Sequence, residues 1–289
     1  MSRSGSPQDL AALLAGRRFA ALTGAGCSTE SGIPDYRGPE TRRRATNPVQ
    51  AREFLHSAPA RARYWARSLV GWPRLAAARP NPAHRALAAL EDLGAMPGVI
   101  TQNVDGLHQA SGSRRVIELH GALSRVRCLV CQRLEPRSDV QQRMLEANPG
   151  FSETFAEQAP DGDAEVPSEL LLTFRAPSCP ACGGALKPDV VFFGEGVPRS
   201  VVDAAFDLLD QAEALLVVGS SLAVYSGFRF VRRAHERGLP IGIVNLGVSR
   251  GDPAASLRVD AHAGQVLPEL ARRLAEAERT ATLHLLKKP

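Results

Sequence analysis

The sequence predicts an α/β fold, in which helices cover both faces of a parallel β-sheet and a smaller unit is inserted into the chain. Two observations predict the sheet: short apolar runs alternate with amphipathic stretches, and a glycine-rich turn follows the first of these runs. A third observation predicts the insert, because two Cys-x-x-Cys pairs and a long acidic stretch interrupt the alternation.

The expected strands are brief apolar runs bounded by Gly, Asn or Ser, which is typical of buried strands. They are Arg18–Leu22, Gly98–Thr101, Leu215–Val218 and Ile241–Asn245. The expected helices are the amphipathic stretches Pro82–Leu93, Val201–Gln211, Phe228–Arg237 and Leu267–Ala277. Ser6-Pro7-Gln8-Asp9 is expected to begin a further helix, because a polar cap precedes a proline in the first turn.

The length of 289 residues is enough for one large core and a smaller module. Hydrophobic residues make up 44% and charged residues 22%, which is ordinary for a soluble globular protein. No segment approaches the roughly 18 apolar residues that span a bilayer. The stretch from Met1 to Gly16 lacks the apolar core of a secretory signal. We therefore expect no membrane partner and a cytoplasmic location in a prokaryote.

The net charge is +5, and almost all of the positive charge is arginine, because the only lysines are Lys187, Lys287 and Lys288. The arginines are spread along the chain, which favours a solvated surface over a nucleic-acid-binding patch. Nucleic acid is therefore not expected as a partner.

Two segments break the alternation and are expected to form the small domain. Residues 41–80 are rich in Arg, Ala and aromatic residues and predict a helical insert. Residues 123–187 contain the cysteine pairs and a Pro-, Glu- and Asp-rich stretch, Asn148 to Pro167, that is typical of a long loop. The large, Rossmann-like domain is then expected to consist of residues 1–40, 81–122 and 188–289.

A turn of small residues, Thr23 to Gly32, follows the first expected strand. Small residues at this place let the backbone approach a diphosphate at the N-terminus of a helix. The turn departs from the dehydrogenase fingerprint, because Thr29 stands where the third glycine is expected and no convincing acidic residue follows about 20 residues later. The alternative is a glycine-rich turn without a ligand.

Four of the five cysteines form the pairs Cys128-x-x-Cys131 and Cys179-x-x-Cys182. Without a secretion signal, this pattern favours a metal over disulfides. Four thiolates complete a tetrahedral Zn²⁺ shell with no open position, so the sequence predicts one structural zinc ion. Four unconnected buried thiols are the alternative. Cys27 is interpreted as a small hydrophobic residue, because the motif pairs no base with it.

Other polar residues also follow expected strands, where the sites of α/β proteins gather. His120 comes just after the apolar run Val116-Ile117-Glu118-Leu119, and Asn103 and Asp105 come after Gly98–Thr101. A surface histidine and a plain Asn/Asp/Gly turn are the alternatives for these positions.

Taken in order, these motifs resemble those of the sirtuin family. GAGCSTESGIPDYRG, residues 24–38, looks like the family's NAD-binding loop. The later pieces follow in the family's order: TQNVDGLH (101–108), LHG (119–121), both cysteine pairs, FFGE (192–195), GSSL (219–222) and VNLG (244–247). The resemblance covers the chain from about Arg18 to Leu267.

A finer resemblance is to class II sirtuins, the lineage of the mitochondrial sirtuin-four type, and a bacterial source is expected. The motifs that carry it are RYWAR (63–67), GWP (71–73), NPAH (81–84), APDGD (159–163) and KPDVVFFG (187–194).

The resemblance implies an NAD-dependent protein lysine deacetylase or deacylase. The acyl group passes from lysine to the ADP-ribose part of NAD, giving nicotinamide, O-acyl-ADP-ribose and free lysine, so NAD is consumed and not reduced. His120 is implied to be the general base, which suits an imidazole because it titrates near physiological pH. Asn103 and Asp105 are implied to hold the nicotinamide and its ribose. The residues implied to bind NAD are Gly24, Ala25, Gly26, Thr29, Ile33, Pro34, Asp35, Tyr36, Arg37, Gln102, Asn103, Asp105, Gly219, Ser220, Ser221, Asn245, Leu246, Gly247 and Ala263.

The partners implied are acylated-lysine proteins or peptides, whose backbone is held as an added strand. The residues implied to hold them are Val191, Phe192, Phe193, Gly194, Val224 and Tyr225. One departure is Ser226, which stands where many sirtuins have Pro, and it predicts a differently shaped substrate clamp.

Tyr64 and Arg67 lie three residues apart in the helical insert, so they share a helix face. Sirtuins that remove acidic acyl groups look similar here, and Arg can offer a carboxylate two parallel donors. A preference for acidic acyl groups is therefore a hypothesis, with a surface ion pair of Arg67 and packing of Tyr64 as the alternative.

Two other functions remain open: a protein ADP-ribosyltransferase, and a non-catalytic NAD-sensing zinc protein. The presence of His120, Asn103 and Asp105 argues against the second, because a sensor has no need of a base.

Overall fold

The computed structural model describes residues 3–35, 49–151 and 171–286, and two β-sheets organise them. The larger sheet has seven strands within these ranges, in the order β1-β10-β9-β8-β2-β3-β4, and each neighbouring pair runs parallel. The strands are β1 (Arg3–Ser4), β2 (Phe19–Thr23), β3 (Val99–Thr101), β4 (Val116–Glu118), β8 (Ala214–Val218), β9 (Ile241–Val244) and β10 (Leu257–Val259). The predicted parallel sheet is confirmed, and the short strands β1 and β10 are additions to it.

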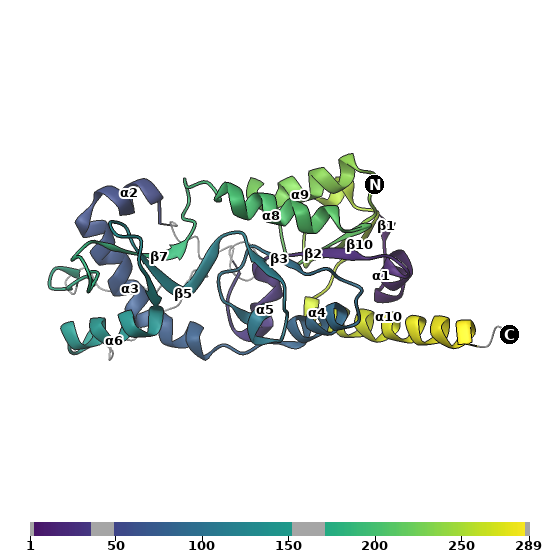
Figure 1. Ribbon diagram of the computed structural model, residues 1–289, viewed down its shortest axis with the longest axis horizontal. Helices are drawn as coiled ribbons and strands as arrows, with labels where there is room; N and C mark the ends of the chain where they lie inside the picture. The colour runs from purple at the N-terminus through teal and green to yellow at the C-terminus, as the bar shows by residue number, and fades with distance from the viewer. Residues whose placement is uncertain (1–2, 36–48, 152–170, 287–289) are drawn as a thin grey trace.

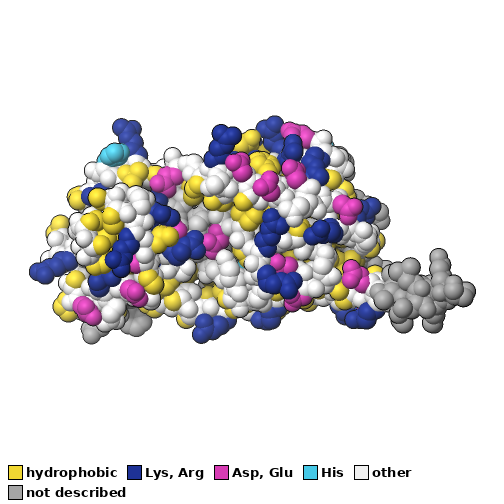
Figure 2. Space-filling model, viewed as in Figure 1, with side chains coloured by type: hydrophobic (Ala, Val, Ile, Leu, Met, Phe, Trp, Pro, Cys, Tyr) yellow, Lys and Arg dark blue, Asp and Glu magenta, His cyan; other side chains and the backbone are white. Residues whose placement is uncertain are grey.

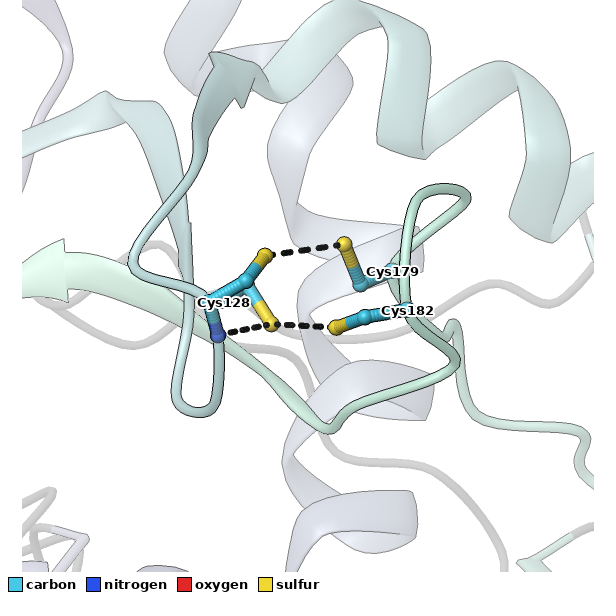
Figure 3. Close-up of side chains that lie close together, drawn as sticks. Cys128, Cys179 and Cys182 are labelled. Atoms are coloured by element: carbon cyan, nitrogen blue, oxygen red, sulfur yellow. Dashed lines mark hydrogen bonds between the residues drawn. The ribbon is translucent and has the colours of Figure 1, made fainter.

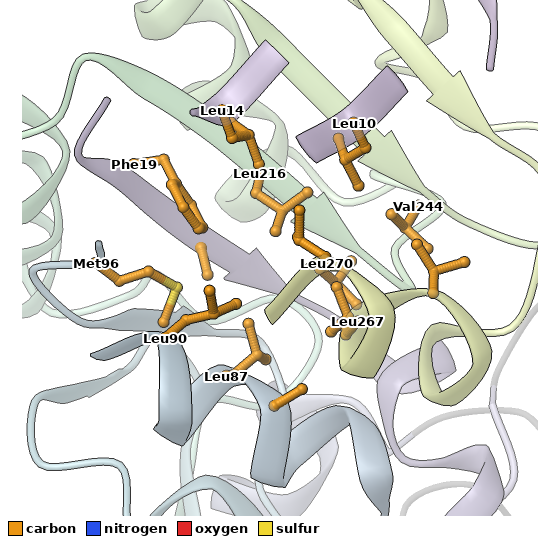
Figure 4. Packing of buried hydrophobic residues seen from close by; sticks show 14 of the residues in the cluster. Leu10, Leu14, Phe19, Leu87, Leu90, Met96, Leu216, Val244, Leu267 and Leu270 are labelled. Carbon is orange, nitrogen blue, oxygen red and sulfur yellow. The ribbon is translucent and has the colours of Figure 1, made fainter. Parts of the chain in front are cut away.

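Helices cover both faces of this sheet (Figure 1). One face carries α1 (Pro7–Leu14), α4 (Pro82–Asp92) and α10 (Ala263–Leu286), and the other carries α8 (Arg199–Asp210) and α9 (Tyr225–Glu236). The side chains of β2 alternate between the faces, with Phe19 and Ala21 in one core and Ala20 and Leu22 in the other. Figure 4 shows how leucines from α1, α4 and α10 converge on strand residues such as Leu216.

The polar helix start expected at Ser6 is confirmed. The Ser6 hydroxyl accepts a hydrogen bond from the Asp9 backbone N–H (3.2 Å), and the Asp9 carboxylate accepts one from the Ser6 N–H (2.9 Å). Two other helices begin earlier than predicted: α9 at Tyr225 and α10 at Ala263. Their first turns contain glycine, Gly227 and Gly264, which weakens the helical pattern of the sequence.

The smaller sheet is antiparallel, in the order β6-β5-β7. It consists of β5 (Gly121–Cys128), β6 (Leu134–Pro136) and β7 (Leu186–Val190), and it packs with α2 (Ala51–His56), α3 (Ala58–Ala77) and α6 (Arg137–Ala147). This unit occupies the left of Figure 1 and has its own core, in which Trp65 donates to the Leu186 carbonyl (3.1 Å). The predicted small inserted unit is confirmed at the level of fold, and α6 ends just before the stretch that was predicted to form a long loop. Most of the loop expected from Asn148 to Pro167 lies outside the described residues.

Arg137 lies inside the small core with 2% of its surface exposed. It donates to the Ser68 carbonyl (3.1 Å) and to Gln141 Oε1 (2.7 Å), and its guanidinium lies 4.9 Å from the Trp72 ring centroid. Burial lowers the pKa of Arg137 to about 10, and the side chain keeps its charge because hydrogen-bond acceptors and aromatic faces surround it.

Among the helices of the described ranges, none combines the length and the apolar character needed to cross a membrane.

The core between α10 and the sheet gives a direct test of the packing. Leu267 is fully buried there, so Leu267→Ala should lower the free energy of unfolding by about 2–5 kcal/mol. Leu172 is 88% exposed, and Leu172→Ala should change it by less than about 0.5 kcal/mol. Chemical denaturation measures both, and equal effects of the two substitutions would contradict this packing.

Candidate active site

The site forms where four parallel strands end at the same edge of the large sheet. Thr23 of β2 pairs in register with Val218 of β8 and with Thr101 of β3, and Val218 pairs with Val244 of β9. The loops that follow these strands line one cavity of about 740 Å³. From β2 the chain continues to β3 on one side, whereas from β8 it continues to β9 on the other. The cavity therefore lies at the topological switch point, where α/β proteins bind ligands.

Glycines bring the loops after β2 and β8 into contact. Gly26 N–H donates to the Gly219 carbonyl (2.9 Å), and Gly24 N–H donates to the Val218 carbonyl (3.0 Å). A methyl group on Gly219, which has φ of +60°, would lie 2.3 Å from the Cys27 backbone nitrogen. These glycines thus serve loop–loop packing as well as access to the cavity.

The residues after Gly24 form two 3₁₀ turns, Ala25–Cys27 and Thr29–Ser31, where the sequence predicted the start of a helix. The second turn ends at Gly32, whose φ of +81° stops it. Thr29 does not line the cavity, and its hydroxyl donates to the Gly26 carbonyl (3.2 Å). The helix N-terminus that the sequence predicted at this place is therefore replaced by two short turns.

Asn103, Asp105 and Ser28 form one hydrogen-bonded group at the inner wall of the cavity. The Asn103 amide donates to the Gly24 carbonyl (3.0 Å) and to Ser28 Oγ (3.0 Å). The Ser28 hydroxyl donates to Asp105 Oδ2 (2.7 Å), and the Leu107 N–H donates to Asp105 Oδ1 (2.9 Å). The bonds lock the loops after β2 and β3 to each other. Ser28 was not predicted as a site residue, although it stands inside the glycine-rich motif.

Behind this group lies a buried cluster of Cys27, His84 and His108, whose potential ligand atoms all lie within 4.8 Å of one another. His84 Nδ1 accepts from the Asn81 N–H (3.3 Å), and His108 Nε2 lies 2.9 Å from the Thr23 hydroxyl. Burial lowers the pKa of His108 to about 3 and raises the pKa of Cys27 far above its ordinary value. The three side chains are therefore neutral, and Cys27 packs as the small hydrophobic residue that the sequence predicted.

His120 lies in the short turn that joins β4 of the large sheet to β5 of the small one. Its Nδ1 lies 2.9 Å from the Gln102 carbonyl, which can only accept, so Nδ1 carries the proton and Nε2 presents its lone pair. The Ser226 hydroxyl lies 2.8 Å from Nε2. Burial lowers the pKa of His120 and the nearby charge of Arg229 lowers it further, while the bond to Gln102 opposes both. A neutral imidazole can accept a proton at Nε2 once another donor takes the place of the Ser226 hydroxyl.

Two short segments of the cavity wall, Val191–Gly194 and Val224–Tyr225, carry apolar side chains. The Val191 N–H donates to the His120 carbonyl (2.9 Å), and Phe193 bridges to Gln50. Phe193, Val224 and Tyr225 are partly exposed at 38%, 36% and 50%. The cavity can accept an extended peptide between the two segments.

Most of the sequence-predicted site residues line this cavity. They are Gly24, Ala25, Gly26, Ile33, Pro34, Asp35, Tyr64, Gln102, Asn103, Asp105, His120, Val191, Phe192, Phe193, Gly194, Gly219, Ser220, Ser221, Val224, Tyr225, Asn245, Leu246 and Gly247. Thr29, Arg67 and Ala263 are described but do not line it, and Tyr36 and Arg37 lie outside the described residues.

Ala263 is buried at the start of α10. There the Gly264 N–H donates to Glu30 Oε2 (2.7 Å), so this position holds the helix against the turn after β2. Ser226, which was predicted to alter the shape of the substrate clamp, lines the cavity. Arg229 also lines it and was not predicted, because the position of the first turn of α9 is not evident from the sequence.

The four paired cysteines gather between β5 and β7, with potential ligand atoms within 4.8 Å of one another. Cys128 Sγ lies 3.5 Å from Cys182 Sγ, and Cys131 Sγ lies 3.7 Å from Cys179 Sγ (Figure 3). None of the four forms a disulfide. The two Cys-x-x-Cys pairs therefore lie side by side, as the sequence predicted.

The electrostatics of this cluster fit a bound cation. The backbone N–H of Cys131 lowers the pKa of Cys128 to about 6. The Arg133 N–H lowers the pKa of Cys131, but the neighbouring thiols of Cys182 and Cys128 outweigh it and raise that pKa to about 11. Four thiolates at this separation repel one another, and Zn²⁺ removes the repulsion while satisfying the tetrahedral set. The cluster can therefore hold zinc.

On the face of the molecule drawn in Figure 2, Lys and Arg side chains are interspersed with Asp and Glu. Several are paired, such as Arg125 with Glu118 (2.8 Å) and Arg237 with Asp210 (3.0 Å).

Comparison with known proteins identifies the family of this chain. Residues 24–226 match the model of the Sir2 family. The chain belongs to the Sir2 family. An NAD-dependent protein deacetylase of Xanthomonas campestris pv. campestris (strain 8004) is 53% identical over 251 residues, which cover 87% of this chain and 86% of that protein. NAD-dependent protein deacetylase 1 of Mycobacterium avium (strain 104) is 51% identical over 279 residues, covering 95% and 97% of the two chains.

A solved structure of a Sir2 protein with a p53 peptide and NAD⁺ has the same fold. It is 31% identical, its TM-score is 0.73, and the match covers 96% of this chain and 100% of the other. The family membership rests on the whole length of the fold and not on the glycine-rich turn alone.

The cysteine cluster gives a prediction about metal content. The purified Sir2-family protein should contain about one Zn²⁺ per chain, and Cys179→Ser should lose it and lower the melting temperature, because metal binding contributes to folding. Cys27→Ser is the control, since Cys27 is buried outside this cluster and its substitution should leave the zinc in place. Elemental analysis measures the metal, and wild-type protein free of zinc would contradict the assignment.

Proposed function

We propose that this Sir2-family chain is an NAD-dependent protein lysine deacetylase, with activity on other acyl groups as well. One observation carries the proposal: the neutral His120, the Asn103–Asp105–Ser28 group and the glycine-bearing loops all line a single cavity. The relatives named NAD-dependent protein deacetylase, at 53% and 51% identity, support it further.

The cavity has the volume and lining that a dinucleotide needs. Its 740 Å³ lies within the range of about 300–1,000 Å³ that is usual for ligand sites. The loops after β2 and β8 consist of small residues, which let a diphosphate approach their backbone closely. In this proposal Gln102 and Asp105 contact the ribose of the nicotinamide half, and Ser220 and Asn245 hold the adenosine half. When bound, NAD supplies the ribose that takes the acyl group, with nicotinamide as the leaving group.

The protein's own contribution to the chemistry is the position and state of His120. Gln102 fixes the tautomer, so Nε2 is the atom that accepts a proton from a ribose hydroxyl. The Ser226 hydroxyl bonds to that lone pair, and the substrate must take its place for transfer to occur. The products of this proposal are nicotinamide, O-acyl-ADP-ribose and free lysine.

Domain roles and lineage form the rest of the proposal. Residues 1–40, 81–122 and 188–289 bind NAD, whereas residues 41–80 and 123–187 form a small domain held by structural zinc. Val191–Gly194 and Val224–Tyr225 clamp the peptide that carries the acyl-lysine. The motif RYWAR at residues 63–67 supports the class II lineage.

His120→Ala should lower the rate of NAD-dependent deacetylation of an acetyl-lysine peptide by about 10²–10⁴-fold, because a positioned base is lost. His235→Ala is the matched control, since His235 is exposed on α9. Chromatographic assay of the deacetylated peptide measures both. A rate for His120→Ala within about threefold of the wild type would remove His120 from the base role.

The pH dependence of the rate should report the same residue. His120 must be neutral to accept a proton, and burial lowers its pKa. The activity should therefore persist below the ordinary imidazole pKa of about 6.5 and fall only at lower pH, as the imidazole becomes protonated. The acid limb of kcat/KM measures this, and a limb centred above about 7 would contradict the neutral, buried base.

A further inference from the structure

The ladder between β5 and β7 is interrupted directly after His120. Gly121 is still paired with Val190 of β7. Residues 122–125 of β5 then lie opposite the single residue Asp189 before the pairing resumes. The backbone hydrogen bonds of a ladder are disrupted over such a bulge. The turn that carries His120 is therefore joined to β7 by less backbone pairing than a regular ladder would give.

The side chain of Arg125 closes this interruption. Its Nε donates to Asp189 Oδ2 (3.0 Å), and its Nη2 donates to Glu118 Oε2 (2.8 Å). Glu118 ends β4 of the large sheet, whereas Asp189 belongs to β7 of the small sheet. One guanidinium therefore connects the two sheets across the turn that carries His120.

The two carboxylates are held on both of their oxygens. Asp189 Oδ1 accepts from Arg127 (3.0 Å), and Glu118 Oε1 accepts from Gln109 (2.8 Å). Only 15% of the Glu118 side chain and 19% of the Asp189 side chain are exposed, so solvent weakens these contacts less than those of a surface pair. Burial lowers the pKa of Arg125, but the hydrogen bonds to the two carboxylates outweigh burial and raise it. The connection is therefore a fixed bridge between the sheets.

Each end of this bridge lies two residues before a residue of the cavity wall. Glu118 precedes His120, and Asp189 precedes Val191. The Val191 N–H in turn donates to the His120 carbonyl (2.9 Å). Arg125 itself does not line the cavity, so it can affect the reaction only through the residues that it holds.

From this geometry we infer that Arg125 is a positioning residue, which keeps the His120 imidazole aligned with the cavity by tying β4 to β7. The inference rests on the proposed deacetylase function, in which His120 is the base. Without the guanidinium, the carboxylates of Glu118 and Asp189 would lose their shared cation and repel each other. The turn could then move away from β7, and a displacement of about 1 Å at a reacting group can cost about 10²-fold in rate.

The first test compares Arg125→Met with Arg143→Met in the NAD-dependent deacetylation of an acetyl-lysine peptide. Arg143 is the matched control, because it pairs with Glu135 (2.9 Å) inside the small unit and is similarly exposed. Arg125→Met should lower kcat by about tenfold and leave KM for NAD within about twofold, whereas Arg143→Met should leave both near the wild type. Arg125→Lys should give an intermediate kcat, because an ammonium keeps the charge but not the fork that reaches both carboxylates.

A double variant tests whether Arg125 acts through Glu118. Arg125→Met combined with Glu118→Gln should be no slower than Arg125→Met alone, because both substitutions break the same connection. If the two losses in kcat multiply instead, the two residues act independently and the inference is wrong.

Hydrogen exchange of the Val191 N–H gives a readout that needs no turnover. This N–H bonds to the His120 carbonyl, so its exchange should be about tenfold faster in Arg125→Met and unchanged in Arg143→Met. Equal exchange in Arg125→Met and the wild type would overturn the inference. A kcat of Arg125→Met within about twofold of the wild type, or an equal loss of kcat in Arg143→Met, would do the same. If the wild type itself does not deacetylate the peptide, the deacetylase function fails, and the exchange of Val191 still decides whether Arg125 holds the turn.

Discussion

The close approach of the loops after β2 and β8 is the constraint on which the site depends. Adjacent parallel strands whose chains leave in opposite directions open a crevice at their carboxyl ends. In this protein the two loops lie so close that the Gly26 N–H donates a hydrogen bond to the Gly219 carbonyl (2.9 Å). Side chains at these positions would force the loops apart. The approach of the loops also fixes Ser28 and Gln102. The Gln102 amide donates to the Ser220 hydroxyl (2.8 Å), and the Asn103 amide donates to the Ser28 hydroxyl (3.0 Å).

Two polar side chains of the cavity wall are fixed by their surroundings. Burial keeps the His120 imidazole neutral, and the Asp105 carboxylate accepts hydrogen bonds from the Ser28 hydroxyl and the Leu107 N–H. His120 also lies in the turn between the two sheets, where Gly121 meets β7 so closely that a methyl group would lie 2.0 Å from the Asp189 carbonyl oxygen. His120 is therefore fixed by the junction of the large and small units. Any shift of the small unit would move it relative to the loops of the large sheet.

The sequence could predict the parallel sheet because its strands are apolar on both faces, and each predicted strand lies within about one residue of the observed one. It could also predict that His120 and Asn103 line one site, since residues after parallel strands meet at one edge. The meeting of the two cysteine pairs was predictable from their spacing, which is typical of a metal site. It could not predict the 3₁₀ turns after Gly24, because glycine-rich segments allow many conformations. Arg229 was missed as a cavity residue for a similar reason: the first turn of α9 contains Ser226 and Gly227, which weaken the helical pattern of the sequence. Arg67 shares a helix with Tyr64, but spacing alone does not decide which residue meets the cavity.

The claim that this cavity joins NAD to an acylated lysine is tested most directly by the stoichiometry of the products. Mass spectrometry of a reaction with an acetyl-lysine peptide and NAD would quantify free lysine peptide, nicotinamide and O-acetyl-ADP-ribose together. The account predicts equal amounts of all three, and none of them without NAD. Release of free acetate with NAD left intact, or ADP-ribose attached to protein in place of O-acetyl-ADP-ribose, would contradict it.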